Sequence, residues 1–559
     1  MDQRTRNSIR IVLLFALLLV PIFYALFTAT DLSYSWAKKI VYSGVVAVCL
    51  LFPALLLKAR TYFIVEGIFN FLFIPIEIAS LYLNRQPTSA PFLQNILHTN
   101  RMEATELLSF MWPVCLLVIA AWIGYFILAA KVENRYLFGP LIRKIVLCGT
   151  LLLFVGGTST MMVLLKRLHS ERSIGETMAE AVGLVEMKFY KIYPYNLYIH
   201  SCHLLQKKHR IRQLKEQVDS FRFGIQPMPD SKELVILVIG EAARYDHFGL
   251  NGYGRNTTPG LSATANLISY ERVYTQANQT DYAVPILLTR ASADRFELAY
   301  SEKSLLEAFQ EAGVWSAYIS KQIPSEITER IGTSCDYSHF YSKNIDIDGN
   351  YDGQMIQDLQ SHVLDTMQFF VLHSLGSHFR YEHRYPASFE HFLPVLGRAA
   401  SYAMISEENK DKLVNAYDNS ILYTDYFLSE LIRYVASLNR PAAVVYISDH
   451  GESFWDDERK LSLHSSYLVS EAEYHVPMFV WYSDEYAASH PTKIEMLRSN
   501  RSKHLSSESV FYSLMDLAGI EELVEQDKSI CSPSLVSIDS IYIHMGSGQV
   551  QRIAIEDIR

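Results

Sequence analysis

The sequence predicts two parts: an α-helical membrane domain with five spans over residues 1–165, and a doubly wound, mostly parallel α/β domain over residues 231–559. Three observations predict this. Long apolar runs are concentrated in the first 165 residues. After them, short apolar strands alternate with helical patterns, which is typical of a doubly wound sheet. Several of those strands end in residue types that bind metals. A chain of 559 residues also exceeds one ordinary domain.

The membrane domain is predicted from runs that are long enough to cross a bilayer. Lysine and arginine residues are unevenly divided between the loops. Nine lie in segments on the same side of the membrane as the amino terminus, and four lie in the loops on the opposite side. Since positively charged loops stay in the cytoplasm, the amino terminus is predicted to be cytoplasmic and the chain after about residue 166 to lie outside. The predicted spans are 11–29, 40–57, 62–83, 107–130 and 145–165.

Two polar features stand out in this domain. The loop 84–106 contains Asn95, Thr99 and Glu103, spaced by four, which a helix would place on one face near the lipid headgroups. A solvated interfacial helix explains that spacing equally well. Glu77 lies inside the third run, where a carboxylate is costly, so it either pairs with another helix, reaches the interface or has a function.

Residues 166–230 are polar to amphipathic and are predicted to form interfacial helices and a linker. Beyond them, the stretch 233–240 is continuously apolar and rich in β-branched residues, as in a strand buried on both faces. Other predicted strands are 314–320, 367–373, 442–448 and 476–482. Predicted helices are 302–312, 353–364, 409–437 and 506–518, and the tail 525–559 is expected to be a short peripheral hairpin.

Three predicted strands end in potential metal ligands. Glu241 follows the first, Asp449 and His450 follow 442–448, and His378 follows 367–373 by a few residues. Open α/β sheets build their sites at the carboxyl ends of strands, so these side chains are expected to meet in one crevice. Together with His464 downstream, they form the mixed carboxylate and imidazole set that suits zinc.

A hydroxyl that such a site could use is Thr280, in Asn278-Gln-Thr-Asp-Tyr-Ala-Val-Pro285. The remaining histidines that we considered are expected to be structural or on the surface: His339, His362, His373 and His475.

Composition bears on nucleic-acid binding and on disulfide bonds. The net charge of −9 gives no indication of a nucleic-acid surface. Three of the six cysteines lie in predicted spans, which leaves Cys202, Cys335 and Cys531 and room for at most one internal disulfide. Whether Cys335 and Cys531 pair is open at this stage.

Several motifs follow one another along the chain: Gly240-Glu241, Gly252-Tyr-Gly-Arg-Asn-Thr-Thr-Pro259, His373-Ser-Leu-Gly-Ser-His378, Arg384-Tyr-Pro386, Tyr417-Asp-Asn419, Leu422-Tyr-Thr-Asp425 and Ser448-Asp-His-Gly-Glu-Ser453. In this order they resemble the motifs of the phosphoethanolamine transferases of Gram-negative envelopes, which belong to the alkaline phosphatase and sulfatase superfamily. The resemblance covers nearly the whole chain, including five spans followed by a periplasmic domain.

The resemblance implies a sheet of alkaline phosphatase and sulfatase type, in a multi-pass protein of the bacterial inner membrane. It implies a reaction in which phosphatidylethanolamine donates its headgroup through a covalent intermediate to an envelope glycolipid, either the lipopolysaccharide core or lipid A. The implied zinc ligands are Glu241, Thr280, Asp449 and His450, with Thr280 as nucleophile. His378 and His464 would bind the phosphoryl group or a second zinc, and Asn95, Thr99 and Glu103 would face the ethanolamine headgroup.

The chain also departs from this pattern. Lipid A-modifying members have Cys-Gly-Thr at the nucleophile and disulfides nearby, whereas this segment reads Gln276-Ala-Asn-Gln-Thr280. Ala242-Ala243 stands in place of hydroxyl residues. The sequence is therefore more similar to the branch that modifies the lipopolysaccharide core, or to an uncharacterised branch.

Other functions share some of these features. A phosphoglycerol transferase acting on a periplasmic glucan would have the same anchor, metal ligands and threonine, but Glu103 favours a headgroup with an ammonium. A sulfatase would need a cysteine or serine followed by proline and arginine, and Thr280 has no such neighbours. A membrane-tethered module without activity would be expected to have lost a ligand position, and all of them are filled.

Overall fold

The amino-terminal and carboxyl-terminal parts of the chain form separate units, residues 1–207 and 208–559, in the computed structural model. The structure describes residues 2–28, 36–84, 87, 88, 93, 96, 101–149, 152, 159, 193–229, 231–341, 349–398, 404–466, 468–545 and 550–558.

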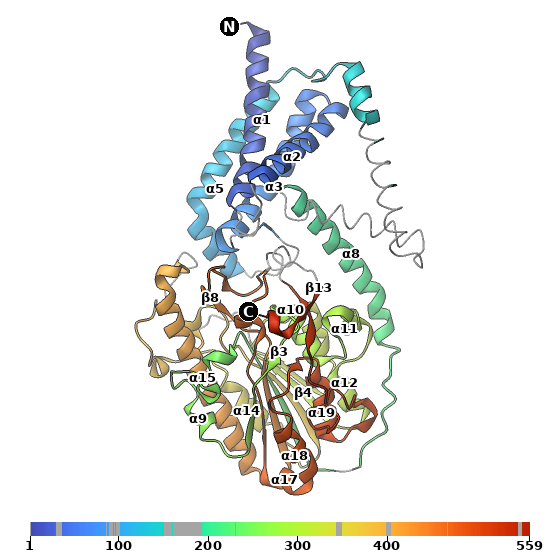
Figure 1. The fold of residues 1–559 in the computed structure, drawn as a ribbon, viewed down its shortest axis with the longest axis vertical. Coiled ribbons are helices and arrows are strands. Elements are labelled where there is room, and N and C mark those ends of the chain that lie inside the picture. Colours follow the sequence, from blue (N-terminus) through green and yellow to red (C-terminus); the bar gives the residue numbers. More distant parts are fainter. Residues whose placement is uncertain are drawn as a thin grey trace. The chain divides into compact units, whose positions relative to one another are not determined.

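The amino-terminal unit is helical (Figure 1). Its helices are α1 (Gln3–Thr28), α2 (Trp36–Leu56), α3 (Ala59–Asn84) and α5 (Arg101–Ala130), and α8 (Tyr195–Val218) begins within it. They enclose an apolar core that includes Leu18 of α1, Tyr62 of α3 and Tyr125 of α5.

In the described residues, one helical stretch, Gln3–Tyr24, is long and apolar enough to cross a membrane. The two halves of α3, Ala59–Asn70 and Leu72–Leu81, are bent by 40° and make a second if they are taken together. The helix Cys115–Ala130 is apolar but shorter. The fifth predicted run, 145–165, lies mostly outside the described residues, so the count of five spans stays a prediction.

The carboxyl-terminal unit is built on one seven-stranded sheet in the order β2-β10-β7-β1-β6-β4-β5. The five strands from β7 to β5 are parallel, and β10 is antiparallel to both of its neighbours. The predicted mostly parallel sheet is present, closed at one side by an antiparallel pair. The strands are β1 (Leu234–Gly240), β2 (Leu267–Tyr270), β4 (Trp315–Ser320), β5 (Tyr337–Phe340), β6 (Gln368–His373), β7 (Ala442–Ser448) and β10 (Met478–Tyr482).

Two apolar cores cover the two faces of this sheet, because alternate side chains of a strand point to opposite faces. Along β1, Val235, Leu237 and Ile239 belong to one core, and Leu234, Ile236 and Val238 to the other. The first core includes residues of α10 (Thr280–Leu288), α12 (Leu305–Glu311), α13 (Glu326–Thr333), α18 (Pro491–Ser499) and α19 (Ser509–Ala518). The second includes residues of α9 (Pro259–Ser262), α14 (Gln354–Gln360) and α15 (Lys410–Ser437).

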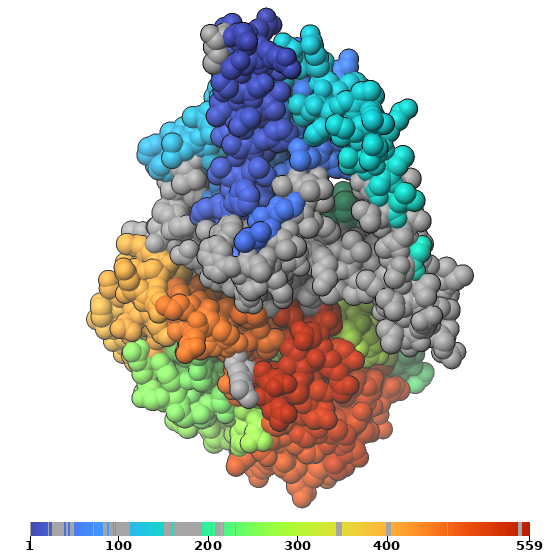
Figure 2. Space-filling view, turned by 45° about the horizontal axis from the view of Figure 1, so that its top comes forward, coloured from blue at the N-terminus to red at the C-terminus, as the bar shows by residue number. Residues whose placement is uncertain are grey.

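The carboxyl-terminal tail corrects one expectation. It does form a hairpin, β12 (Ser540–His544) and β13 (Val550–Ala554), and its segment forms part of the surface seen in red in Figure 2. The hairpin is not peripheral, however, because Ile543 is fully buried and His544 forms a β-bridge with Ala277. Its apolar strand face packs in a small core that it shares with Tyr274 and Tyr474, so the tail is part of the fold.

Short paired segments complete the unit. They are β3 (Val273–Tyr274) with β11 (Leu505–Ser506), and β8 (Ser453–Phe454) with β9 (Ser462–Leu463), together with helices α11 (Leu298–Ser301), α16 (Glu471–Tyr474) and α17 (Asp484–Ser489).

Candidate metal centre and nucleophile

The ends of the two central strands bring three potential metal ligands together. Gly240, the last residue of β1, is in register with Ser448, the last residue of β7. Glu241 and Asp449 therefore leave the sheet side by side, and His450 follows. One ligand atom from each of these three buried residues lies within 4.8 Å of the others. The structure thus brings together three of the four residues that the resemblance assigns to zinc.

The hydrogen bonds around these ligands leave suitable atoms for a metal. His450 Nε2 lies 3.4 Å from Glu241 Oε1 and 3.5 Å from Asp449 Oδ2. Both of these oxygens are buried and have no hydrogen-bond partner. Asp449 Oδ1, by contrast, accepts from the amides of Ala242 and His450 at 3.2 and 2.7 Å. His450 Nδ1 lies 2.8 Å from the Gly451 carbonyl, so it carries the proton and Nε2 offers a lone pair. Two unpaired carboxylate oxygens and an imidazole nitrogen fit zinc.

The charges of the site are also suited to a bound cation. Burial and repulsion from Glu241 raise the pKa of Asp449. Burial lowers the pKa of His450, but the attraction of Asp449 and Glu241 outweighs it and raises that pKa above its usual range. A bound metal ion would add positive charge beside these two buried carboxylates, where a charged His450 would otherwise supply it.

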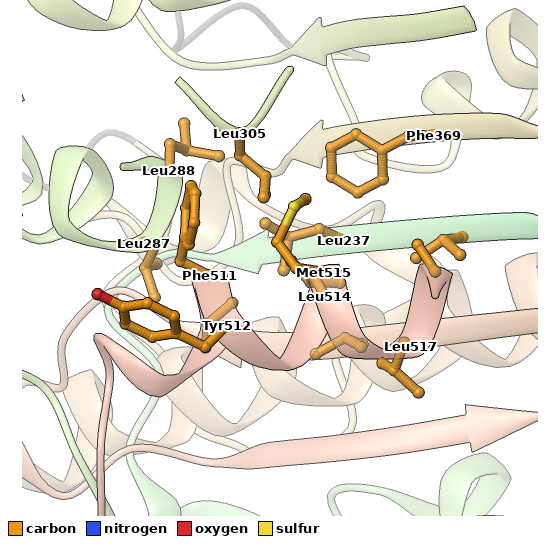
Figure 3. Packing of buried hydrophobic residues seen from close by; sticks show 14 of the residues in the cluster. Leu237, Leu287, Leu288, Leu305, Phe369, Phe511, Tyr512, Leu514, Met515 and Leu517 are labelled. Carbon is orange, nitrogen blue, oxygen red and sulfur yellow. The ribbon is translucent and has the colours of Figure 1, made fainter. Parts of the chain in front are cut away.

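Thr280 completes the arrangement as the first residue of α10. Its Oγ1 donates to Glu241 Oε2 at 3.2 Å and lies 3.4 Å from His450 Nε2. At the amino-terminal end of a helix, the local field favours negative charge on this oxygen. The rest of α10 is anchored by burial, and Figure 3 shows Leu287 and Leu288 beside Phe511 of α19. The hydroxyl is therefore held beside the ligands.

His464 lies next to the ligands without being one of the three. Its ring centroid is 4.3 Å from that of His450. Its Nδ1 is 3.0 Å from Glu452 Oε1, and Glu452 Oε2 accepts from Tyr381 OH at 2.9 Å. Since Glu452 is fully buried and held by Tyr381, it fixes the orientation of the His464 ring.

His378 lies on the same side of the sheet, after β6. Its Nδ1 is 3.3 Å from the Phe379 carbonyl. Burial raises the pKa of Glu241, but positive charge on His450, His378 and His464 lowers it, with a net fall below the ordinary value. Positive charge on either histidine would therefore stabilise the ionised form of Glu241.

The sequence analysis did not identify Gln322, which follows β4. Gln322 Nε2 donates to Glu241 Oε2 at 2.9 Å and to the Ser374 carbonyl at 3.0 Å. A signal was available, because residues 321 and 322 directly follow the predicted strand 314–320. A neutral amide is not a usual zinc ligand, so the strand-end pattern that indicates Glu241 and Asp449 does not indicate Gln322.

The backbone around Glu241 is tightly packed. Gly376 has a φ of +47°, and a Cβ atom there would lie 2.9 Å from both the N and the O of Glu241. Ala242 has a φ of +54°, which costs a non-glycine residue free energy. The Ala242 carbonyl accepts from the buried Tyr417 OH at 2.7 Å, which helps to hold this conformation. Strained backbone of this kind is common where a side chain is placed for function.

The predicted headgroup residues are beyond what the structure describes. Asn95 and Thr99 lie outside the described residues, and Glu103 lies in α5 with its side chain outside them. Glu77 is described and buried: its Oε2 accepts from Asn196 Nδ2 at 2.9 Å and from the Thr88 amide at 3.1 Å. It is therefore paired with α8 within the amino-terminal unit.

The open question about the cysteines is also answered. Cys335 and Cys531 are both free, so they do not form a disulfide with each other.

Comparison with protein families gives two matches. The family model described as sulfatase matches residues 233–520, which is more than half of the chain. The model described as phosphoethanolamine transferase EptA/EptB matches residues 89–168.

Individual relatives agree with these families. Phosphoethanolamine transferase EptA of Escherichia coli K12 is 28% identical over 320 residues, covering 54% of this chain and 56% of that protein. The Kdo(2)-lipid A phosphoethanolamine 7''-transferase of the same strain is 32% identical over 267 residues, covering 45% of each chain. The chain thus spans about half the length of the curated relatives that it matches.

Solved structures show the same fold. The integral membrane lipooligosaccharide phosphoethanolamine transferase A (EptA) from Neisseria meningitidis matches with a TM-score of 0.70 at 20% identity, covering 94% of this chain and 98% of that chain. The zinc complex of the carboxyl-terminal periplasmic domain of EptC from Escherichia coli matches with a TM-score of 0.51 at 22% identity, covering 60% of this chain and 95% of that domain. The chain belongs to the sulfatase family, and its residues 89–168 match the phosphoethanolamine transferase EptA/EptB model.

Proposed function

We propose that this protein transfers phosphoethanolamine from phosphatidylethanolamine to an envelope glycolipid, the lipopolysaccharide core or lipid A, through a covalent intermediate on Thr280. The supporting observation is the position of Thr280 Oγ1, 3.2 Å from Glu241 and 3.4 Å from His450 at the start of a buried helix. The relatives are named phosphoethanolamine transferases, which supports the transferred group and does not favour a phosphoglycerol transferase.

The residues present fit a zinc ion held by Glu241, Thr280, Asp449 and His450. When bound there, zinc lowers the pKa of a hydroxyl and neutralises negative charge on phosphoryl oxygens. The zinc complex of the related EptC domain supports this choice of metal.

The chain's own groups then account for two displacements at phosphorus. In the first, the Thr280 oxygen forms a bond to the phosphorus of phosphatidylethanolamine, and the bond to the diacylglycerol oxygen breaks. Because the Thr280 hydroxyl donates its proton to the hydrogen bond with Glu241, a lone pair of its oxygen is free to attack the phosphorus. In the second, an acceptor hydroxyl attacks the same phosphorus, and the Thr280 oxygen leaves and regains a proton.

His464 and His378 provide for the charge and protons of these steps. We assign His464, held by Glu452, to a phosphoryl oxygen or to the leaving oxygen, because its orientation is fixed beside His450. We assign His378, which follows β6, to the same role. Either could hold a second zinc instead. Both roles require a histidine that is near the ligands and still partly accessible, as the 25% exposure of the His464 side chain allows.

The membrane unit supplies proximity to the donor. We propose that it is anchored in the bacterial inner membrane with the carboxyl-terminal unit in the periplasm, and that Asn95, Thr99 and Glu103 face the ethanolamine headgroup. Holding the site at the bilayer surface replaces a diffusive encounter with an oriented one.

The covalent step is tested directly on the full-length protein. Incubation with phosphatidylethanolamine and no acceptor, followed by digestion and mass spectrometry, is expected to find one phosphoethanolamine group on Thr280. Thr280→Ala should fold and transfer nothing, and Thr280→Ser should retain part of the activity because it keeps the hydroxyl. An active Thr280→Ala protein, or an adduct on Thr275 or Thr289, would refute the assignment.

The acceptor is identified by a different measurement. Mass spectrometry of envelope glycolipids from cells with and without the gene should show one added phosphoethanolamine unit on the core oligosaccharide or on lipid A. An added unit on a glucan, or a phosphoglycerol unit on any polymer, would contradict the proposal.

A further inference from the structure

The segment that leads into Thr280 has no cysteine, so its position depends on non-covalent contacts. Asn278, two residues before Thr280, is fully buried. Its Nδ2 donates to Glu473 Oε2 at 2.7 Å and to the Ser466 carbonyl at 3.1 Å. Its own carbonyl accepts from the Ser465 amide at 3.2 Å. A single side chain and its backbone thus connect the Thr280 segment to the residues directly after His464.

Glu473 is also fully buried and lies in α16. Besides Asn278, its carboxylate accepts from the Ser453 hydroxyl at 2.9 Å and from the Ser466 amide at 3.3 Å. Its backbone carbonyl accepts from the Gly451 amide at 2.8 Å. Glu473 therefore contacts Gly451 and Ser453, which lie on either side of Glu452 and directly follow the proposed ligand His450.

Glycine is required at position 451 because the backbone of α16 approaches it closely. A Cβ atom at Gly451 would lie 2.0 Å from the Ala472 carbonyl oxygen. The loop that carries His450 is thus pressed against the helix that carries Glu473. Any shift of Glu473 would be transmitted to both the metal loop and the Asn278 segment.

We propose that Asn278 and Glu473 are a positioning pair, which holds the nucleophile Thr280 in register with His450 and His464 through one buried hydrogen bond. The inference rests on the proposed function and adds two residues to it. Neither residue touches the reacting atoms. Their contribution is geometric, since a displacement of about 1 Å between a nucleophile and its partners can cost a hundredfold in rate.

The pair works because its hydrogen bonds are directional and buried. A carboxylate only accepts hydrogen bonds, and Glu473 accepts them from donors on three different segments. Replacing the Asn278 amide by a carboxylate removes the donor and sets an acceptor against acceptors, which costs far more inside a protein than in water.

The test exchanges donor and acceptor within the pair, in the full-length protein with phosphatidylethanolamine as donor. Asn278→Asp should lower kcat about tenfold or more and leave KM for the donor nearly unchanged. Glu473→Gln should keep most of the activity, because its carbonyl still accepts from Asn278. The double variant Asn278→Asp with Glu473→Gln should recover part of the loss, because the new amide can donate to the new carboxylate.

The matched control is Asn500→Asp, at another buried asparagine, whose Nδ2 donates to the carbonyls of Ile530 and Ser532, each at 2.9 Å. It should lower the melting temperature as the same exchange does at Asn278, but it should not lower kcat. If Asn278→Asp does not fold, Asn278→Ala removes the same donor without adding a charge and is used in its place.

A wild-type kcat in the Asn278 variant, or an equal loss in Asn500→Asp, would overturn the proposal. Zinc affinity, measured by competition with a chelator, is the second readout and should fall in Asn278→Asp alone. If the parent protein does not transfer phosphoethanolamine at all, the proposed function fails. The zinc measurement then decides the positioning pair by itself, and equal affinity in all variants refutes it.

Discussion

Gln322 offers the sharpest test of the proposed metal centre, because it contacts the proposed ligand Glu241 without being a ligand itself. Its side-chain amide donates to Glu241 Oε2 and to the Ser374 carbonyl, and the residue is 7% exposed. Replacement by leucine keeps most of the volume and removes both donors. A hydrogen bond to a charged group contributes about 1.5–3 kcal/mol, so the loss should loosen Glu241 and lower metal affinity about 10- to 100-fold.

Metal affinity is measured by chelator competition on purified full-length protein, with the free energy of unfolding measured in parallel. Gln322→Leu should also lower the free energy of unfolding by about 1–3 kcal/mol, because the Ser374 carbonyl is left without this donor. The matched control is Gln368→Leu, at the other end of β6. Gln368 is fully buried and bonds the His362 carbonyl and the Leu364 amide at 2.9 and 2.7 Å.

The control should lose similar stability and keep the metal affinity of the parent. An unchanged affinity in Gln322→Leu would show that its bond to Glu241 does not support the metal. An equal loss of affinity in Gln368→Leu would show that the effect follows from stability, and the reasoning would be refuted in either case.

Three further predictions concern other groups. Asp449→Ala should lose the tightly bound zinc, whereas His378→Ala should retain it and lose most activity; equal zinc contents by metal analysis would contradict the assignment. Glu103→Gln should weaken the use of phosphatidylethanolamine without unfolding the carboxyl-terminal unit. Normal transfer by this variant would support a phosphoglycerol transferase instead. Burial lowers the pKa of His373 to about 4, although Glu241 opposes this, so the neutral ring is favoured by folding and stability should be lost as pH falls from about 6.5 to 4. The free energy of unfolding should fall by about 3 kcal/mol over this pH range, and His373→Leu should reduce that fall in denaturant titrations. An unchanged dependence on pH would show that another group is responsible.

The sheet could be predicted from the sequence where its strands are buried on both faces. β1, β6 and β7 are buried along their whole length and their central residues are all apolar, so the sequence alone indicates strands that are covered on both faces. β2 and β5 are edge strands of only four residues, which is too short for alternation to stand out in the sequence.

The site was predictable to the extent that its chemistry lies at strand ends. Glu241, Asp449 and His450 follow buried strands, and their meeting follows from the parallel arrangement. The helix α10 was missed because it has only nine residues and contains Pro285. Asn278 and Glu473 lie 195 positions apart. No local pattern predicts such a pair, because its stability depends on where two distant loops meet.

The position of β1 and β7 inside the sheet has a consequence for hydrogen exchange. Each has hydrogen-bonded neighbours on both sides, whereas β2 and β5 have a neighbour on one side only. Backbone amides in β1 and β7 should therefore exchange with solvent only through global unfolding, and those of the two outer strands through local opening. Glu241 and Asp449 directly follow these two strands, which should be the slowest-exchanging part of the unit. Their carboxylates should therefore stay side by side while the outer strands of the sheet open locally.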